Sequence, residues 1–159
     1  MIRRYFRKTM NKTILQQQLM EFFRDLTSLG GLAAYILITL LYIKSLIFIG
    51  LLFGFFFTAA IVIVIRLFYF KDRPKKEGYA NLIERIAASA FPSLHAARIV
   101  FLAMLFSAHY NSNYLTGAFT VTAIAASYSR IYLQKHDYAD VIGGVILGGV
   151  TFMIASYWF

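Results

Sequence analysis

Long uncharged stretches of apolar residues alternate with short polar segments along most of the chain. Residues 46–65 form 20 consecutive positions without a charged side chain, about the length of helix that crosses a bilayer core. A second uncharged run, 29–43, is separated from it only by Lys44 and Ser45. A single helix over 29–65 would be about 55 Å long, too long for one crossing, so we expect a turn at these two residues.

The second half of the chain repeats this pattern. Residues 99–129 carry no charge if His109 is neutral, and the polar triplet 111–113 is the natural break between two helices. The sequence therefore predicts an all-α integral membrane helical bundle, with one transmembrane domain over 29–159. Its five expected transmembrane helices cover residues 29–43, 46–66, 94–110, 114–130 and 138–158.

Two pairs of glycines lie four residues apart within these predicted helices. They are Gly50 with Gly54 and Gly144 with Gly148. Small residues at this spacing let helices approach closely in lipid, so we interpret both pairs as helix-packing positions.

The first 28 residues are too polar to span a membrane. Apolar side chains nevertheless recur there at helical spacing, behind a basic N-terminal stretch. This pattern is typical of an amphipathic helix that lies at the membrane surface. The apolar positions of this expected helix, over 1–28, are Leu15, Leu19, Phe22, Phe23 and Leu26.

The composition supports a membrane protein and indicates which chemical class of partner it binds. Hydrophobic residues make up 60% of the chain and charged residues 14%, too apolar for an ordinary soluble domain. The absence of cysteine excludes a disulfide scaffold. The net charge of +9 favours anionic partners, and counting five crossings places every Lys and Arg except Lys44 on one membrane face.

Polar groups that are costly near a membrane gather in three clusters, each beside the end of a predicted helix. Because these ends lie on the same face, we expect the clusters to converge. The first cluster contains Arg66, Lys71, Asp72 and Arg73, the second Ser93, His95 and Arg98, and the third Ser129, Arg130, Lys135, His136, Asp137 and Asp140.

The first two clusters suit an anion. Arg73, like Arg130 of the third cluster, offers a planar set of donors that matches phosphate oxygens. Pro92 and Ser93 are typical of a helix start, where unpaired backbone N–H groups favour a negative charge. His95 falls in the first turn of that helix, within reach of a bound anion.

The third cluster suggests a nucleophile. His136 and Asp140 are four residues apart, so on a helix they share a face, and the carboxylate can hold one imidazole nitrogen while the other attacks. We interpret His109 as an ordinary histidine and Arg98 as structural. The remaining basic residues of these segments are interpreted as interfacial charges: Lys71, Lys75, Lys76, Arg85 and Lys135.

Together the three clusters resemble the tripartite signature of the phosphatidic acid phosphatase type 2 family, KxxxxxxRP, PSGH and SRxxxxxHxxxD. Residues 66–74 match the first spacing, 92–95 match three of the four positions of the second motif, and 129–140 match the third in full. Two residues depart from it: Arg66 replaces a lysine, and Leu94 replaces the glycine. Leu94 is harmless if its backbone is helical and strained if its φ is positive.

The resemblance implies a phosphatase that needs no metal or cofactor and works through a phosphohistidine. His136 would attack phosphorus, Asp140 would orient it, and His95 would protonate the leaving oxygen. Family members typically have six spanning helices, so the first is expected to be reduced here to the N-terminal amphipathic helix. The implied phosphate ligands are Arg66, Arg73, Ser93, Arg130 and the backbone N–H of Leu94.

A lipid phosphate is the expected substrate, because its tail can stay in the bilayer while the head group enters a polar site. Candidates are phosphatidylglycerophosphate, undecaprenyl diphosphate, phosphatidic acid and the 1-phosphate of lipid A, and the short loops predict a broad range. Residues 77–91 are expected to form a short interfacial helix, a lip over the site. Nucleic acid is not an expected partner.

Two further expectations concern location and the rival function. Family relatives place the site on the periplasmic face of a bacterial plasma membrane, whereas the basic N-terminal segment points that face toward the cytoplasm. The alternative function is a membrane protein that binds or translocates anionic lipids without turnover.

Overall fold

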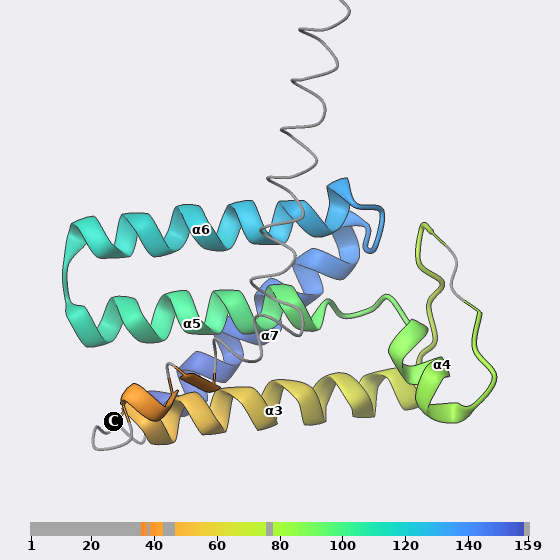
Figure 1. Ribbon diagram of the computed structural model, residues 1–159, viewed down its shortest axis with the longest axis horizontal. Coiled ribbons are helices and arrows are strands. Elements are labelled where there is room, and N and C mark those ends of the chain that lie inside the picture. The colour runs from red at the N-terminus through yellow and green to blue at the C-terminus, as the bar shows by residue number, and fades with distance from the viewer. Residues whose placement is uncertain (1–35, 38, 43–46, 76–77, 158–159) are drawn as a thin grey trace, which may run out of the picture.

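In the computed structural model the described residues are 36–37, 39–42, 47–75 and 78–157, and within them every regular element is a helix (Figure 1). The predicted all-α class is confirmed. The expected amphipathic helix over 1–28 and most of the expected helix over 29–43 lie outside the described residues. The helices are α3 (Ile47–Phe68), α4 (Leu82–Ala88), α5 (Leu94–Tyr110), α6 (Asn113–Tyr132) and α7 (Tyr138–Ala155).

The central helix of this arrangement is α5, which contacts α3, α6 and α7. In Figure 1, α3 and α6 lie along opposite sides of α5, and α7 crosses α5 obliquely. The helices α5 and α6 are joined by a tight turn, in which Asn111 takes a left-handed conformation (φ 45°) and closes the end of α5. This turn divides the uncharged run 99–129 where the sequence pattern predicts.

Small residues allow the helices to approach closely. A Cβ atom at Gly54 would lie within 2.5 Å of the Phe101 ring, so α3 accommodates this aromatic side chain of α5. A Cβ atom at Gly144 or Gly148 would overlap the backbone of α5. Gly54 of the first predicted pair therefore lies at a helix contact, as do Gly144 and Gly148 of the second pair.

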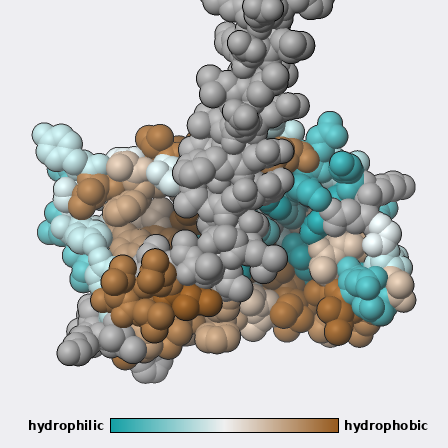
Figure 2. Space-filling model, in the orientation of Figure 1, coloured by the Kyte–Doolittle hydropathy of each residue, from teal (hydrophilic) through white to brown (hydrophobic). Residues whose placement is uncertain are grey.

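Two of the described helices, α3 and α7, are long and apolar enough to cross a membrane, and α5 is a shorter apolar helix. Large hydrophobic side chains are exposed along them, among them Phe56 on α3 and Ile146 on α7. Figure 2 shows hydrophobic residues over α3 and hydrophilic ones near the C-terminal end of α6. These features are compatible with a membrane location, and the count of five crossings stays a prediction.

The short helix α4 occupies part of the segment where a lip is predicted. The Asn81 side chain accepts a hydrogen bond from the Glu84 N–H (2.8 Å), and the Glu84 carboxylate accepts one from the Ala80 N–H (2.7 Å). These reciprocal contacts satisfy donors at the helix start. Leu82 and Ile83 are exposed, so α4 presents an apolar edge at the end of the bundle where α3 ends (Figure 1).

Candidate active site

Four helix ends meet at one end of the bundle, and each carries part of a sequence cluster. Arg66 lies in the last turn of α3, Ser93 caps the start of α5, Arg130 lies in the last turn of α6, and Asp140 lies in the first turn of α7. All four side chains are buried. The Ser93 N–H donates to the Asp140 carbonyl (2.9 Å), which joins the starts of α5 and α7 directly. The three clusters thus converge.

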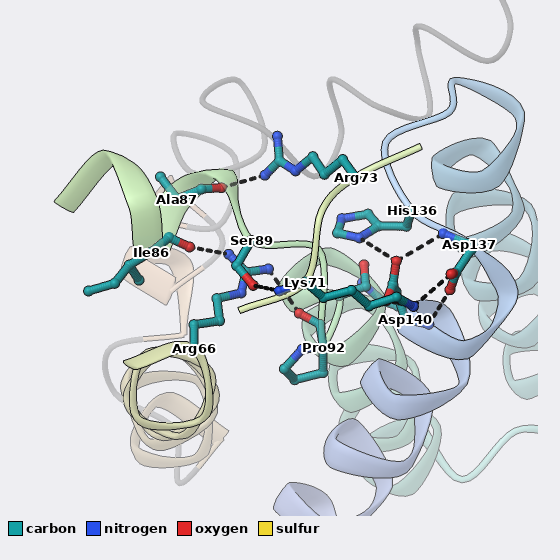
Figure 3. A network of polar contacts seen from close by, with 12 residues as sticks. Arg66, Lys71, Arg73, Ile86, Ala87, Ser89, Pro92, His136, Asp137 and Asp140 are labelled. Atoms are coloured by element: carbon teal, nitrogen blue, oxygen red, sulfur yellow. Dashed lines mark hydrogen bonds and ion pairs between the residues drawn. The ribbon is translucent and has the colours of Figure 1, made fainter. Parts of the chain in front are cut away.

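Arg66 connects α3 to the segment that leads into α5. Its guanidinium donates to the Ile86 carbonyl (3.1 Å from Nη1) and to the Pro92 carbonyl (2.9 Å from Nη2). Its Nε–H is buried and has no hydrogen-bond partner among the described residues. Arg73 donates in the same way to the Ala87 carbonyl (2.5 Å). Both arginines therefore hold α4 and its connection to α5 (Figure 3), and their positive charges act on His136.

The start of α5 has the geometry of an anion site. The fully buried Ser93 is the N-cap, and its hydroxyl oxygen accepts from the Ala96 N–H (3.4 Å). Leu94 is the first helical residue, and its φ is not positive. The described non-glycine residues with positive φ are Asn111 and Gln134. Leucine therefore sits without strain in place of glycine. His95 follows in the first turn and interacts electrostatically with Arg130 and His136.

A tight turn after α6 presents His136 to the site. Gln134 takes a left-handed conformation (φ 54°), and the Arg130 carbonyl accepts hydrogen bonds from the N–H groups of Lys135 (3.1 Å) and His136 (3.2 Å). These bonds satisfy a carbonyl that the end of a helix leaves unpaired. The turn fixes the position of His136 relative to Arg130, and the imidazole is almost completely buried.

His136 and Asp140 face each other, although not as two residues of one helix. His136 precedes α7, whose N-cap is Asp137, so the two side chains face each other across the helix start and not along one helix face. The Asp137 side chain accepts from the Asp140 N–H (3.0 Å), and the Asp140 carboxylate accepts from the Asp137 N–H (2.9 Å). This capping box leaves Asp140 Oδ2 at 3.7 Å from His136 Nδ1, while Nε2 is the nitrogen away from the carboxylate.

Lys71 belongs to the site, which corrects its interpretation as an interfacial charge. Its Nζ lies 2.6 Å from Asp137 Oδ2 and 2.8 Å from Asp140 Oδ1 (Figure 3). The signal for this contact is the spacing of the two aspartates: carboxylates three residues apart at a helix start share a side, and a buried carboxylate requires a counter-charge.

The site is strongly positive around the imidazole of His136. Burial lowers the pKa of His136 to about 3, assisted by the positive charges of Arg130, Arg73 and Arg66. His136 is therefore neutral near pH 7, with a lone pair available. Burial alone would lower the pKa of Lys71, but its bonds to Asp137 and Asp140 outweigh burial and raise it. The ammonium therefore stays charged.

His109 lies away from the site, and Arg98 contacts a neighbouring helix. His109 is in the last turn of α5, at the opposite end of that helix from Ser93, and its ring contacts those of Tyr42 and Tyr110. The guanidinium of Arg98 lies over the ring of Phe55 (4.0 Å to the centroid) and bridges α5 to α3. These positions agree with their interpretation as an ordinary histidine and a structural arginine.

Comparison with known proteins adds one finding to this geometry. A family model described as the PAP2 superfamily matches residues 47–159, which include all three clusters and the helices α3 to α7. No curated protein and no solved structure matches the chain significantly.

Proposed function

Because the chain belongs to the PAP2 superfamily, whose members are phosphatases, we propose that it is an integral membrane phosphatase that hydrolyses lipid phosphates through a phosphohistidine. The observation that supports this proposal most directly is the placement of His136. It is a buried, neutral imidazole that faces a carboxylate at 3.7 Å and interacts with the charges of three arginines.

The proposed reaction has two displacements. The lone pair of His136 Nε2 attacks phosphorus, the bond to the ester oxygen breaks, and protonated His95 gives its proton to the departing oxygen. Water, which loses a proton to His95, then attacks phosphorus and displaces the imidazole, and inorganic phosphate leaves. Hydrolysis of phosphate monoesters is extremely slow without a catalyst. The covalent intermediate replaces this one high activation barrier with two lower ones.

The charges of the site supply the remaining stabilisation in this proposal. The guanidinium groups of Arg66, Arg73 and Arg130 and the N–H groups at the start of α5 bind the phosphoryl oxygens, as oriented donors do for developing charge. The negative phosphate favours the protonated form of His95, which lies in the first turn of α5 and interacts with the charge of Arg130. Asp140 balances the positive charge that His136 acquires when its Nε2 is phosphorylated.

The lipid character of the substrate is proposed from the surroundings of the site. Arg73 donates to the Ala87 carbonyl of α4, so this helix lies directly beside the phosphate ligands. Its exposed Leu82 and Ile83 form an apolar edge next to them. We infer that α4 contacts the lipid tail at the interface. Candidate lipids are phosphatidylglycerophosphate, undecaprenyl diphosphate, phosphatidic acid and the 1-phosphate of lipid A.

The proposal is tested by release of inorganic phosphate from these four lipids by purified protein in detergent. We expect release from several of them, unchanged by EDTA and inhibited by vanadate, which adopts the five-coordinate geometry of the reacting phosphorus. Strict activity on a single lipid would contradict the broad range. Binding of every lipid without release, by a correctly folded protein, would support the rival function of binding or translocation.

We also propose that the site faces outward from a bacterial plasma membrane. The chain has no cysteine, so single cysteines report their own positions. Asn113, at the start of α6, and Gly78, in the exposed segment before α4, are both accessible. In intact cells, an impermeant thiol reagent is expected to label Gly78→Cys and to leave Asn113→Cys unlabelled until the cells are opened. The reverse pattern would place the site in the cytoplasm.

A further inference from the structure

Lys71 contacts the two aspartates at the start of α7, and its own backbone is held by hydrogen bonds. This residue follows the end of α3, and its N–H donates to the Ser89 hydroxyl (3.3 Å), while its carbonyl accepts from the Ala90 N–H (2.8 Å). Its backbone is therefore joined to the connection between α4 and α5. From there the side chain reaches across to α7, where Nζ contacts Asp137 and Asp140 (Figure 3).

These contacts leave Asp140 little freedom to rotate. Oδ1 accepts from Lys71 Nζ (2.8 Å) and Oδ2 accepts from the Asp137 N–H (2.9 Å). Each carboxylate oxygen thus has its own anchor, and the side chain is fully buried. With both oxygens anchored, Oδ2 stays directed at the Nδ1 atom of His136 (3.7 Å).

The net charge of Lys71, Asp137 and Asp140 together argues against Lys71 as a phosphate ligand. One ammonium and two carboxylates carry a net charge of −1, which repels a phosphate. The lysine is shared by two acceptors at 2.6 and 2.8 Å, so binding phosphate would break charge-assisted bonds. The positive charges that act on the imidazole of His136 come from Arg66, Arg73 and Arg130.

We propose that Lys71 is a positioning residue, which fixes the Asp140 carboxylate so that His136 presents Nε2 to phosphorus. This inference rests on the proposed function and adds to it a residue outside the family signature. The titratable and charged groups that interact with His136 among the described residues are Asp140 on α7, His95 on α5 and the three arginines named above, and the Ala90 backbone forms a hydrogen bond with it. Lys71 neutralises part of the Asp140 charge through a direct hydrogen bond (2.8 Å).

The first experiment compares Lys71→Met with Lys71→Arg and with Lys75→Met. Lys75 is an exposed lysine of the same segment, so its replacement removes the same charge nearby. We expect Lys71→Met to lower kcat by about 10–100-fold with KM little changed, the loss typical of residues that orient the ligands of a metal site, because Lys71 orients Asp140 in the same way. Lys71→Arg should restore most of kcat, and Lys75→Met should match the wild type. An increase in KM with unchanged kcat would instead make Lys71 a substrate ligand and overturn the proposal, as would unchanged kinetics.

A second readout does not depend on turnover. The chain has three histidines, so ¹⁵N-histidine NMR spectra are simple and can be assigned with single replacements. In Lys71→Met the pKa of His136 is expected to rise, because one positive charge is removed and the Asp140 charge is no longer shared. Lys75→Met should leave this pKa where it is. An unmoved pKa in Lys71→Met would contradict the positioning role.

The two readouts separate this inference from the proposed function. If the wild type releases no phosphate from any lipid, the phosphatase proposal fails, and the NMR shift still decides whether Lys71 acts on the His136–Asp140 pair. If Lys71→Met does not fold, Lys71→Gln serves instead. It keeps an N–H donor and loses the charge, so it should also raise the pKa of His136 and lower kcat. Its failure to do either overturns the proposal.

Discussion

Replacement of His136 by alanine is expected to abolish phosphate release, with a loss of at least about 10³-fold in kcat. The alanine variant has no atom that can form the bond to phosphorus, and the arginines can then only bind the substrate. Phosphate release in detergent measures the loss. Wild-type protein that is quenched in alkali after brief exposure to ³²P-labelled substrate should retain label that acid removes, as a phosphorus–nitrogen bond requires.

His109→Ala is the matched control, because this histidine lies in the last turn of α5, away from the four converging helix ends. It should retain wild-type activity and yield the same labelled protein. Turnover in His136→Ala that approaches the wild-type rate would refute the phosphohistidine mechanism. So would label that survives acid in the wild type, because a phosphate ester would then be the intermediate.

Replacement of Gly144 by alanine is expected to destabilise the protein by about 1–3 kcal/mol and to reduce activity as well. The new Cβ atom would lie close to the Ser93 carbonyl and to the Ala96 Cβ atom (2.9 Å), and a backbone atom cannot move aside as a flexible side chain can. The starts of α5 and α7 must therefore separate. The bond from the Ser93 N–H to the Asp140 carbonyl (2.9 Å) spans this gap.

Gly149→Ala is the control on the same helix, because nothing lies within 4 Å of a Cβ atom at this position. Alanine there should be neutral or stabilise the helix by about 0.5–1 kcal/mol. Thermal unfolding in detergent gives the stability, and phosphate release gives the activity of each variant. Equal melting temperatures and activities for the two variants would show that the close approach at Gly144 is unimportant.

The convergence of the clusters could be predicted because it depends on the order of charged and apolar segments alone. Once the apolar runs are taken as helices that reverse direction at each turn, Arg66, Ser93 and Arg130 must fall at one end of the bundle. The helical state of Leu94 could be inferred in the same way, from the helix-start signal of Pro92 and Ser93. Long apolar segments are informative in this way because a helix that crosses a bilayer core needs about 20 apolar residues.

The details that the sequence did not reveal depend on single side chains. The capping box of Asp137 and Asp140 fixes the start of α7 and leaves His136 outside the helix, so the pair faces each other through these side chains and not through a shared helix face. The partner of Asp140 lies 69 positions away in the sequence, so no local pattern distinguishes Lys71 from the other lysines of its segment. Folding of the connection between α3 and α5 decides which lysine reaches α7.

The ordinary helical backbone at Leu94 has a consequence for how the second motif is understood. At the first position of a helix, a residue contributes an N–H group that no intrahelical carbonyl accepts, whatever its side chain is. The chemical content of this motif is therefore a hydroxyl, an imidazole and one main-chain amide. The side chain at position 94 is half-buried. A different side chain at this position would leave the proposed phosphate-binding amide in place.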